Sequence, residues 1–118
     1  TVNAVVAPTR SEAEALLLPN LQLMARLRTG QPLGPLDLVE DAATTTMAPP
    51  AGSIVAAARS RAVVGAPAEA ADQIRSLVAE FDVDEVMVNP VASAHRGTDP
   101  GTAPDRELTL ELLAKELF

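Results

Sequence analysis

The sequence contains no cysteine, tyrosine or tryptophan, only two phenylalanines and a single histidine. Without cysteine the chain cannot form a disulfide framework, a zinc ribbon or a thiol nucleophile. One histidine excludes a multi-histidine metal site within one chain. Although 47% of the residues are hydrophobic, the near absence of aromatic residues means that the core must be built from alanine, leucine and valine.

Positive charge is also scarce, because 9 basic residues stand against 16 acidic ones and give a net charge of −7. A nucleic-acid-binding protein needs a cationic surface for phosphate, and a negative membrane surface would repel this chain. No apolar stretch approaches the length of a membrane helix, and no signal-peptide pattern is present. These absences predict a cytoplasmic protein. Its 118 residues leave room for one domain or a piece of one.

The clearest pattern lies in residues 61–89. Arg61–Val64 reads as a short apolar strand that Gly65-Ala66-Pro67 ends. From Pro67 to Phe81 the apolar residues recur every three or four positions, which predicts a helix with one buried face. A second apolar strand follows within Glu85–Asn89. Two short apolar strands joined by an amphipathic helix predict a parallel βαβ unit whose sheet is covered on both faces.

The N-terminal third predicts another strand and helix. Val2–Ala7 reads as a buried strand. Ser11 followed by Glu14 has the spacing of a capping box, in which the hydroxyl and the carboxylate each accept from a free backbone N–H. A helix is then expected from Glu12 toward Thr29. Pro19 lies within it and removes one backbone hydrogen bond, which predicts a kink or two helical pieces.

Two stretches lack a regular pattern. Residues 31–52 carry four prolines and predict an irregular insertion, better explained by disorder or surface packing than by a binding loop. Ser53 is expected to cap a short helix, Ile54–Ser60. Residues 89–103 form the second irregular stretch, and Thr102 is a candidate cap for the last helix. That helix carries leucines over more than half of its circumference: Leu108, Leu110, Leu112, Leu113 and Leu117.

The whole chain thus reads as three consecutive β/α units with parallel strands. The loops that follow parallel strands collect at one edge of the sheet, where α/β proteins place their functional residues. Three strands are too few to cover their own faces and edges. Because the chain starts at Thr1 and is apolar almost at once, we expect a truncated product of a longer chain. The alternative is a non-catalytic α/β module that associates with itself into a homo-oligomer.

Several stretches together resemble the C-terminal portion of bacterial-luciferase-like flavin-dependent monooxygenases. They are VNAVVAPT followed by SEAEALLLPNLQLMARLRTGQP, then AVVGAPAEAADQIRSLV, then DVDEVMVNP, and finally TLELLAKEL. The most specific part is the Val-Val-Gly-x-Pro turn, followed by a helix and Val-Asp-Glu-Val-Met-Val. The resemblance spans nearly the whole chain, and its succession of motifs carries more weight than any one of them.

This resemblance implies a (β/α)₈ barrel that binds reduced FMN, or a deazaflavin in some branches, and passes electrons to oxygen or to a small organic substrate. Val2–Ala7 would be the sixth barrel strand, Arg61–Val64 the seventh and Val86–Val88 the eighth. The first five strands and much of the flavin site would then lie outside this chain. We therefore expect the isolated chain to be inactive and to retain no flavin.

Two departures from the family pattern affect the predicted site. Relatives commonly carry Ala-Asp-Thr where this chain has Ala7-Pro8-Thr9, and they often carry Ser or Thr at the position of Ala66. An alanine side chain cannot accept from a helix N–H, so the cap is weaker by about 1 kcal/mol. Gly65 and Ala66 remain candidates for backbone contact with an anion or flavin, although a simple strand-to-helix turn explains one glycine better.

The other candidates lie near the ends of strands. His95 and Arg96 would supply a proton donor and an anion clamp, with Asp99 orienting the imidazole; an exposed pair without catalytic function is the commoner case. Asn3 and Asn89 interrupt apolar strands, so they either touch a flavin ring at a barrel mouth or cap a strand end. A further cluster, which we interpret as a solvated turn and not as a metal site, consists of Asp82, Asp84 and Glu85.

Overall fold

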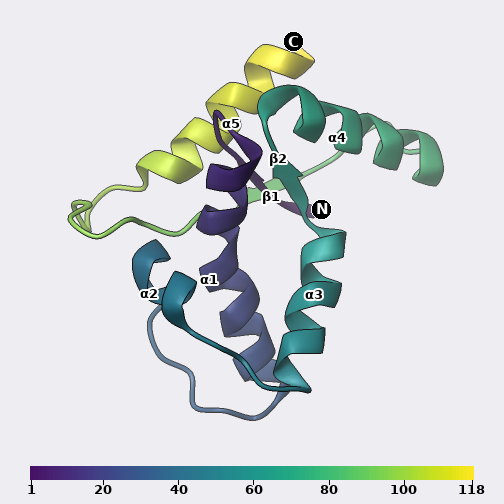
Figure 1. Cartoon of the computed structure of the whole chain (residues 1–118). Coiled ribbons are helices and arrows are strands. Elements are labelled where there is room, and N and C mark those ends of the chain that lie inside the picture. Colours follow the sequence, from purple (N-terminus) through teal and green to yellow (C-terminus); the bar gives the residue numbers. More distant parts are fainter.

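The computed structural model describes all 118 residues and has one parallel sheet and five helices (Figure 1). In chain order the elements are β1 (Val2–Val6), α1 (Arg10–Arg28), α2 (Val39–Thr44), α3 (Ala51–Arg61), β2 (Val63–Gly65), α4 (Pro67–Phe81), β3 (Val88–Pro90) and α5 (Pro104–Leu117). The predicted α/β class with parallel strands is confirmed. None of the helices combines the length and the apolar character needed to cross a membrane.

The first strand lies in the middle of the sheet, and the strand order is β2-β1-β3. Val5 of β1 aligns with Val64 of β2, and Asn3 of β1 aligns with Asn89 of β3, both in parallel register. Three successive strands of a closed barrel would each pair with the next, which would place β2 in the middle. The strand order therefore differs from that of neighbouring sixth, seventh and eighth barrel strands.

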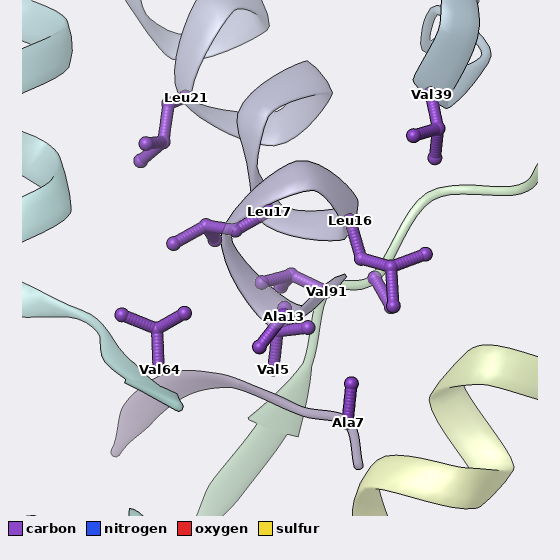
Figure 2. Close-up of a cluster of buried hydrophobic side chains, with 10 residues drawn as sticks. Val5, Ala7, Ala13, Leu16, Leu17, Leu21, Val39, Val64 and Val91 are labelled. Carbon is purple, nitrogen blue, oxygen red and sulfur yellow. The ribbon is translucent and has the colours of Figure 1, made fainter. Parts of the chain in front are cut away.

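Helices cover both faces of the sheet, as the apolar strands predicted. On one face α1 and α3 pack over Val5 and Val64, and Figure 2 shows Ala13 and Leu17 of α1 close to these two valines. On the other face, α4 and α5 bury Ala4 and Val6. Because β1 pairs on both sides and is covered on both faces, Ala4, Val5 and Val6 are fully buried.

The capping residue predicted for α1 is wrong. Thr9, in an extended conformation, caps the helix, and its Oγ1 accepts from the backbone N–H of Glu12 at 3.2 Å. Ser11 lies inside the helix, and Glu14 pairs with arginines and not with a backbone N–H. The helix also continues through the buried Pro19 as one element, because packing on one face compensates for the missing hydrogen bond. Two helical pieces are therefore excluded.

Residues 31–52 are less irregular than predicted. They include the short helix α2 and the first turn of α3, which begins at Ala51 after Pro50. Ser53 lies within α3 and does not cap it. Val39 and Ala42 are buried, and Nε2 of Gln22 on α1 donates to the carbonyl of Ala42 at 3.1 Å. Tertiary packing thus makes this segment helical where the local sequence is not.

The observed bounds of β2 and β3 also differ from the predicted ones. The helix α4 covers the predicted residues, and Asp82 ends it in a left-handed conformation with φ of 49°. Arg61 belongs to α3, so β2 begins at Val63. Val86 and Met87 precede β3, which begins only at Val88, since its bounds follow the register with β1 and not the apolar run.

The last helix begins after Thr102, and Thr102 does not cap it. The N-cap residue is Ala103, and the hydroxyl of Thr102 donates to the carbonyl of Asp99 at 2.9 Å. The predicted cap is therefore wrong. The helix is instead anchored from its interior: Oγ1 of the buried Thr109 accepts from the backbone N–H of Val6 at 3.1 Å and so ties α5 to the end of β1.

The two free edges of the sheet are obstructed to different extents. At the β2 edge, the side-chain amide of Gln73 on α4 accepts from the N–H of Val64 at 3.0 Å and donates to its carbonyl at 2.9 Å. These are the hydrogen bonds that a neighbouring strand would make. At the β3 edge, Asn89 faces β1 in the parallel ladder, so Pro90 faces outward and offers no N–H. The β2 edge is thus closed to another strand, and the β3 edge lacks one backbone donor.

Candidate functional site

The carboxyl ends of the three strands form the candidate site, because parallel strands place the loops that follow them at this edge. After β1, Arg10 begins α1 and lies 3.4 Å from Glu14 and 3.4 Å from Glu69 on α4. Glu14 also pairs with Arg59 of α3. The hydrogen bond from Arg59 has the largest effect and lowers the pKa of the Glu14 carboxyl; burial opposes it, and the charge of Arg59 and the contact with Arg10 lower the pKa further.

The turn after β2 is closed by the chain's own carboxylate. Gly65 has a φ of 154°, and a Cβ added there would lie 3.1 Å from Cβ of Glu69, so glycine suits both the conformation and the space. Oε1 of Glu69 accepts from the backbone N–H of Ala66 at 3.2 Å. An incoming anion would have to displace this carboxylate. The geometry therefore supports the simple-turn interpretation of Gly65-Ala66-Pro67.

The loop after β3 is held firmly near the sheet. The N–H of Ser93 donates to the carbonyl of Leu16 at 3.0 Å, and its hydroxyl donates to the carbonyl of Asp37 at 2.6 Å. Nε of Arg106 donates to the carbonyl of Ala92 at 3.0 Å. A groove of about 250 Å³ lies between this loop, residues 36–38 and the start of α5. It is the concave surface that borders the carboxyl end of β3.

His95 and Arg96 point toward α2. Nδ1 of His95 lies 3.0 Å from Oε1 of Glu40, the N–H of Arg96 donates to Oε2 of Glu40 at 2.8 Å, and the Arg96 guanidinium lies 2.8 Å from Asp41. Asp99 does not orient the imidazole, because its carboxylate accepts from the N–H of Gly101 at 2.9 Å. That part of the prediction is wrong: Glu40, in the supposedly irregular insertion, takes the role.

The contacts of Glu40 affect its titration. Hydrogen bonds from its own backbone N–H and then from that of Arg96 lower the pKa of the Glu40 carboxyl, and the hydrogen bond with His95 adds to them. The ionised carboxylate therefore fastens α2 to the loop after β3. Nothing within the local sequence of residues 31–52 indicated this, since the partners lie 55 and 56 residues away.

The two asparagines lie toward the opposite end of the sheet. Nδ2 of Asn89 donates to Oδ1 of Asn3 at 3.0 Å across the paired strands. Asn3 is the second residue of β1, so the pair lies nearer the amino ends of the strands than the loops that carry His95 and Gly65. This single hydrogen bond joins the two strands, as a cross-strand side-chain pair does.

The predicted site residues thus occupy three separate places. Gly65 and Ala66 lie with Glu69, His95 and Arg96 lie with α2, and the asparagines pair within the sheet. The described chain contains no cluster of three or more His, Cys, Asp or Glu residues able to hold a metal ion. The acidic turn is exposed, and it comprises Asp82, Asp84 and Glu85. These residues do not assemble into a flavin cradle by themselves.

Comparison with known proteins identifies a similarity in fold. No family model matches the chain, and no curated protein matches it. The solved structure of apo-MsnO8 is similar with a TM-score of 0.73 and 20% sequence identity, over 98% of this chain and 32% of that one. The likeness is one of fold. The chain spans about a third of the length of MsnO8, and a match of this identity establishes no activity.

Proposed function

We propose that this chain is the C-terminal portion of a luciferase-like flavin-dependent monooxygenase or oxidoreductase, inactive by itself and cytoplasmic. The observation that carries the proposal is the order of its parts: the stretches that resemble the family follow one another along three parallel β/α units. The similarity in fold to about a third of apo-MsnO8 is consistent with a part of a larger protein.

In such an enzyme the reduced flavin would supply the electrons that activate oxygen, and the protein would supply binding and exclusion of water. The residues of this chain do not fit a flavin on their own, because the turn before α4 holds Glu69 and the Arg96 guanidinium is paired with Asp41. Their part in the proposal is to hold the loops at the carboxyl edge. Contacts to the flavin would come from residues outside the chain.

Flavin binding and oxygen consumption test this proposal. The isolated chain should lose FMN during gel filtration, whereas a longer protein that contains the chain should consume oxygen when reduced FMN is added. A flavin absorbance band that stays with the isolated chain would contradict the placement of the flavin site outside it. A longer protein without flavin-dependent oxygen consumption would contradict the proposed activity.

The strand order offers a second test in that longer protein. Asn3 and Asn89 are cross-strand neighbours, and neighbouring strands bring Cα atoms within the range that a disulfide spans. Because the chain has no cysteine, Asn3→Cys with Asn89→Cys introduces the only pair within it. Rapid oxidation to a disulfide is expected if β1 and β3 remain neighbours. A pair that stays reduced would mean that another strand lies between them.

A second candidate function is the self-associating α/β module. Large apolar side chains favour it, since Phe81, Met87 and Phe118 are 65%, 62% and 103% exposed. The closed β2 edge argues that such association would use helix surfaces and not a strand added at β2. Light scattering compared with the chain mass of 12.3 kDa decides the matter: a well-folded monomer would remove this candidate.

A further inference from the structure

A pocket at the amino end of β1 contains the two basic side chains that have no acceptor in the structure. Six other basic residues form ion pairs with carboxylates, and Arg106 donates to a backbone carbonyl. Only Arg28 at the end of α1 and Arg61 at the end of α3 remain. Both line one pocket of about 270 Å³ between these helices.

The other polar side chains that line this pocket are uncharged. No aspartate or glutamate lines it, although the chain has 16 acidic residues. Asn3 and Asn20 contribute side-chain amides, and Oδ1 of Asn3 is already occupied by Asn89. The Asn3 amide therefore presents its N–H groups as free donors. The polar lining, which also includes Thr1, thus carries two arginines and amide donors but no carboxylate, and this suits an anion.

The rest of the lining is apolar. Leu17 and Leu21 of α1 are buried, at 1% and 5% exposure, and Met24 lies beside them. Arginines also occur at helix C-termini because they complement the helix dipole. The helix dipole would explain the positive charge of Arg28 and Arg61, but it would not explain why the two side chains line the same apolar pocket. A ligand with a carboxylate at one end and a short hydrocarbon body would contact both kinds of surface.

We propose that this pocket, lined by Arg28, Arg61, Asn3 and Asn20, binds a small organic carboxylate with an apolar tail. The pocket lies at the amino ends of the strands, away from the loops at the carboxyl edge of the sheet. It is therefore a separate site that does not depend on the proposed oxidoreductase activity. The small volume restricts the tail to a short chain.

Titration of the isotopically labelled protein with hexanoate, followed by NMR, tests this site. We expect saturable shifts of the Asn3 and Asn20 side-chain amides, with a Kd of about 0.1–1 mM for a ligand of this size. Hexanol lacks the charge and inorganic phosphate lacks the tail, so each should bind at least about tenfold more weakly. Shifts confined to other residues, or equal binding of phosphate and hexanoate, would overturn the proposal.

Substitutions test whether Arg28 and Arg61 bind the carboxylate of hexanoate. Arg28→Gln and Arg61→Gln should each weaken hexanoate binding about tenfold, because each removes one charge-assisted hydrogen bond. Both side chains are exposed and without partners, so the fold should be unaffected. The matched control is Arg75→Gln on α4, an exposed arginine paired with Asp72, and it should bind hexanoate as the unchanged protein does. Unchanged affinity in both pocket variants would refute the assignment.

Discussion

Replacement of Gln73 by alanine should destabilise the protein far more than an ordinary surface substitution. The side chain makes two hydrogen bonds, at 3.0 and 2.9 Å, to the backbone of Val64. Val64 is only 1% exposed, so its N–H and carbonyl would lose their partners in a poorly hydrated place. An unsatisfied buried group costs about 1–3 kcal/mol. Because Gln73 itself is only half-buried, water offsets part of the loss, and we expect about 2 kcal/mol in total.

Urea unfolding measures this loss directly. With a dependence on urea of about 1–3 kcal/mol per molar, the midpoint should fall by about 1 M. Gln73→Glu keeps an acceptor for the Val64 N–H but loses the donor to the Val64 carbonyl. The urea midpoint of this variant should therefore lie between those of the unchanged protein and Gln73→Ala. The matched control is Asp72→Ala, the neighbouring exposed residue with a surface ion pair, which should change stability by less than about 1 kcal/mol.

Amide hydrogen exchange localises the effect. In the Gln73→Ala variant the Val64 amide should exchange about 30-fold faster, which corresponds to about 2 kcal/mol. The opened edge should also increase association in light scattering. If Gln73→Ala unfolds at the same urea concentration as Asp72→Ala and the Val64 amide stays protected, then Gln73 does not close the β2 edge and the reasoning fails.

Three further predictions concern single side chains. Ala66→Ser should complete the capping box with Glu69 and raise the free energy of unfolding by about 0.5–1 kcal/mol, seen as a higher urea midpoint; a lower midpoint would contradict the cap geometry. Because its folded pKa is lowered from 4.5, the Glu40 carboxylate stabilises the fold above its unfolded pKa. This stabilisation is lost as pH falls through the folded value, so Glu40→Gln should be less stable than the unchanged protein at pH 7 and should converge with it once the pH is below the folded pKa. Thr109→Val removes the acceptor of the buried Val6 N–H and should cost about 1–3 kcal/mol in thermal unfolding, an effect absent if water replaces the hydroxyl.

Local signals were sufficient for some elements. The helix α4 has a proline in its first turn, a glutamate that reaches back to the backbone and one apolar face, so its sequence predicts both ends. The same holds for β1, whose successive residues face opposite sides of the sheet and are buried on both sides. In these elements the residues that determine the structure lie within the element.

Elsewhere the decisive contacts are distant in sequence. Thr9 and Ser11 are both able to cap a helix, and which of them caps α1 depends on where β1 ends. The short helix α2 depends on its packing against α1 and on the pairing of Glu40 with His95. The sequence therefore predicted a candidate histidine but not its carboxylate partner. The strand order depends on which strands pair with β1, which no local pattern encodes.

The central position of β1 has a consequence for synthesis of the protein. Of the three strands, β1 is made before the others; it pairs with β2 and β3, and its last residue bonds to Thr109, which lies 103 residues later in the chain. At about 5–20 residues per second, translation takes on the order of 5–20 s to reach that residue. During this interval β1 lacks α5, and for most of it β1 also lacks β3. We expect the nascent chain to depend on chaperones during that delay, and its folding to be slow for its size.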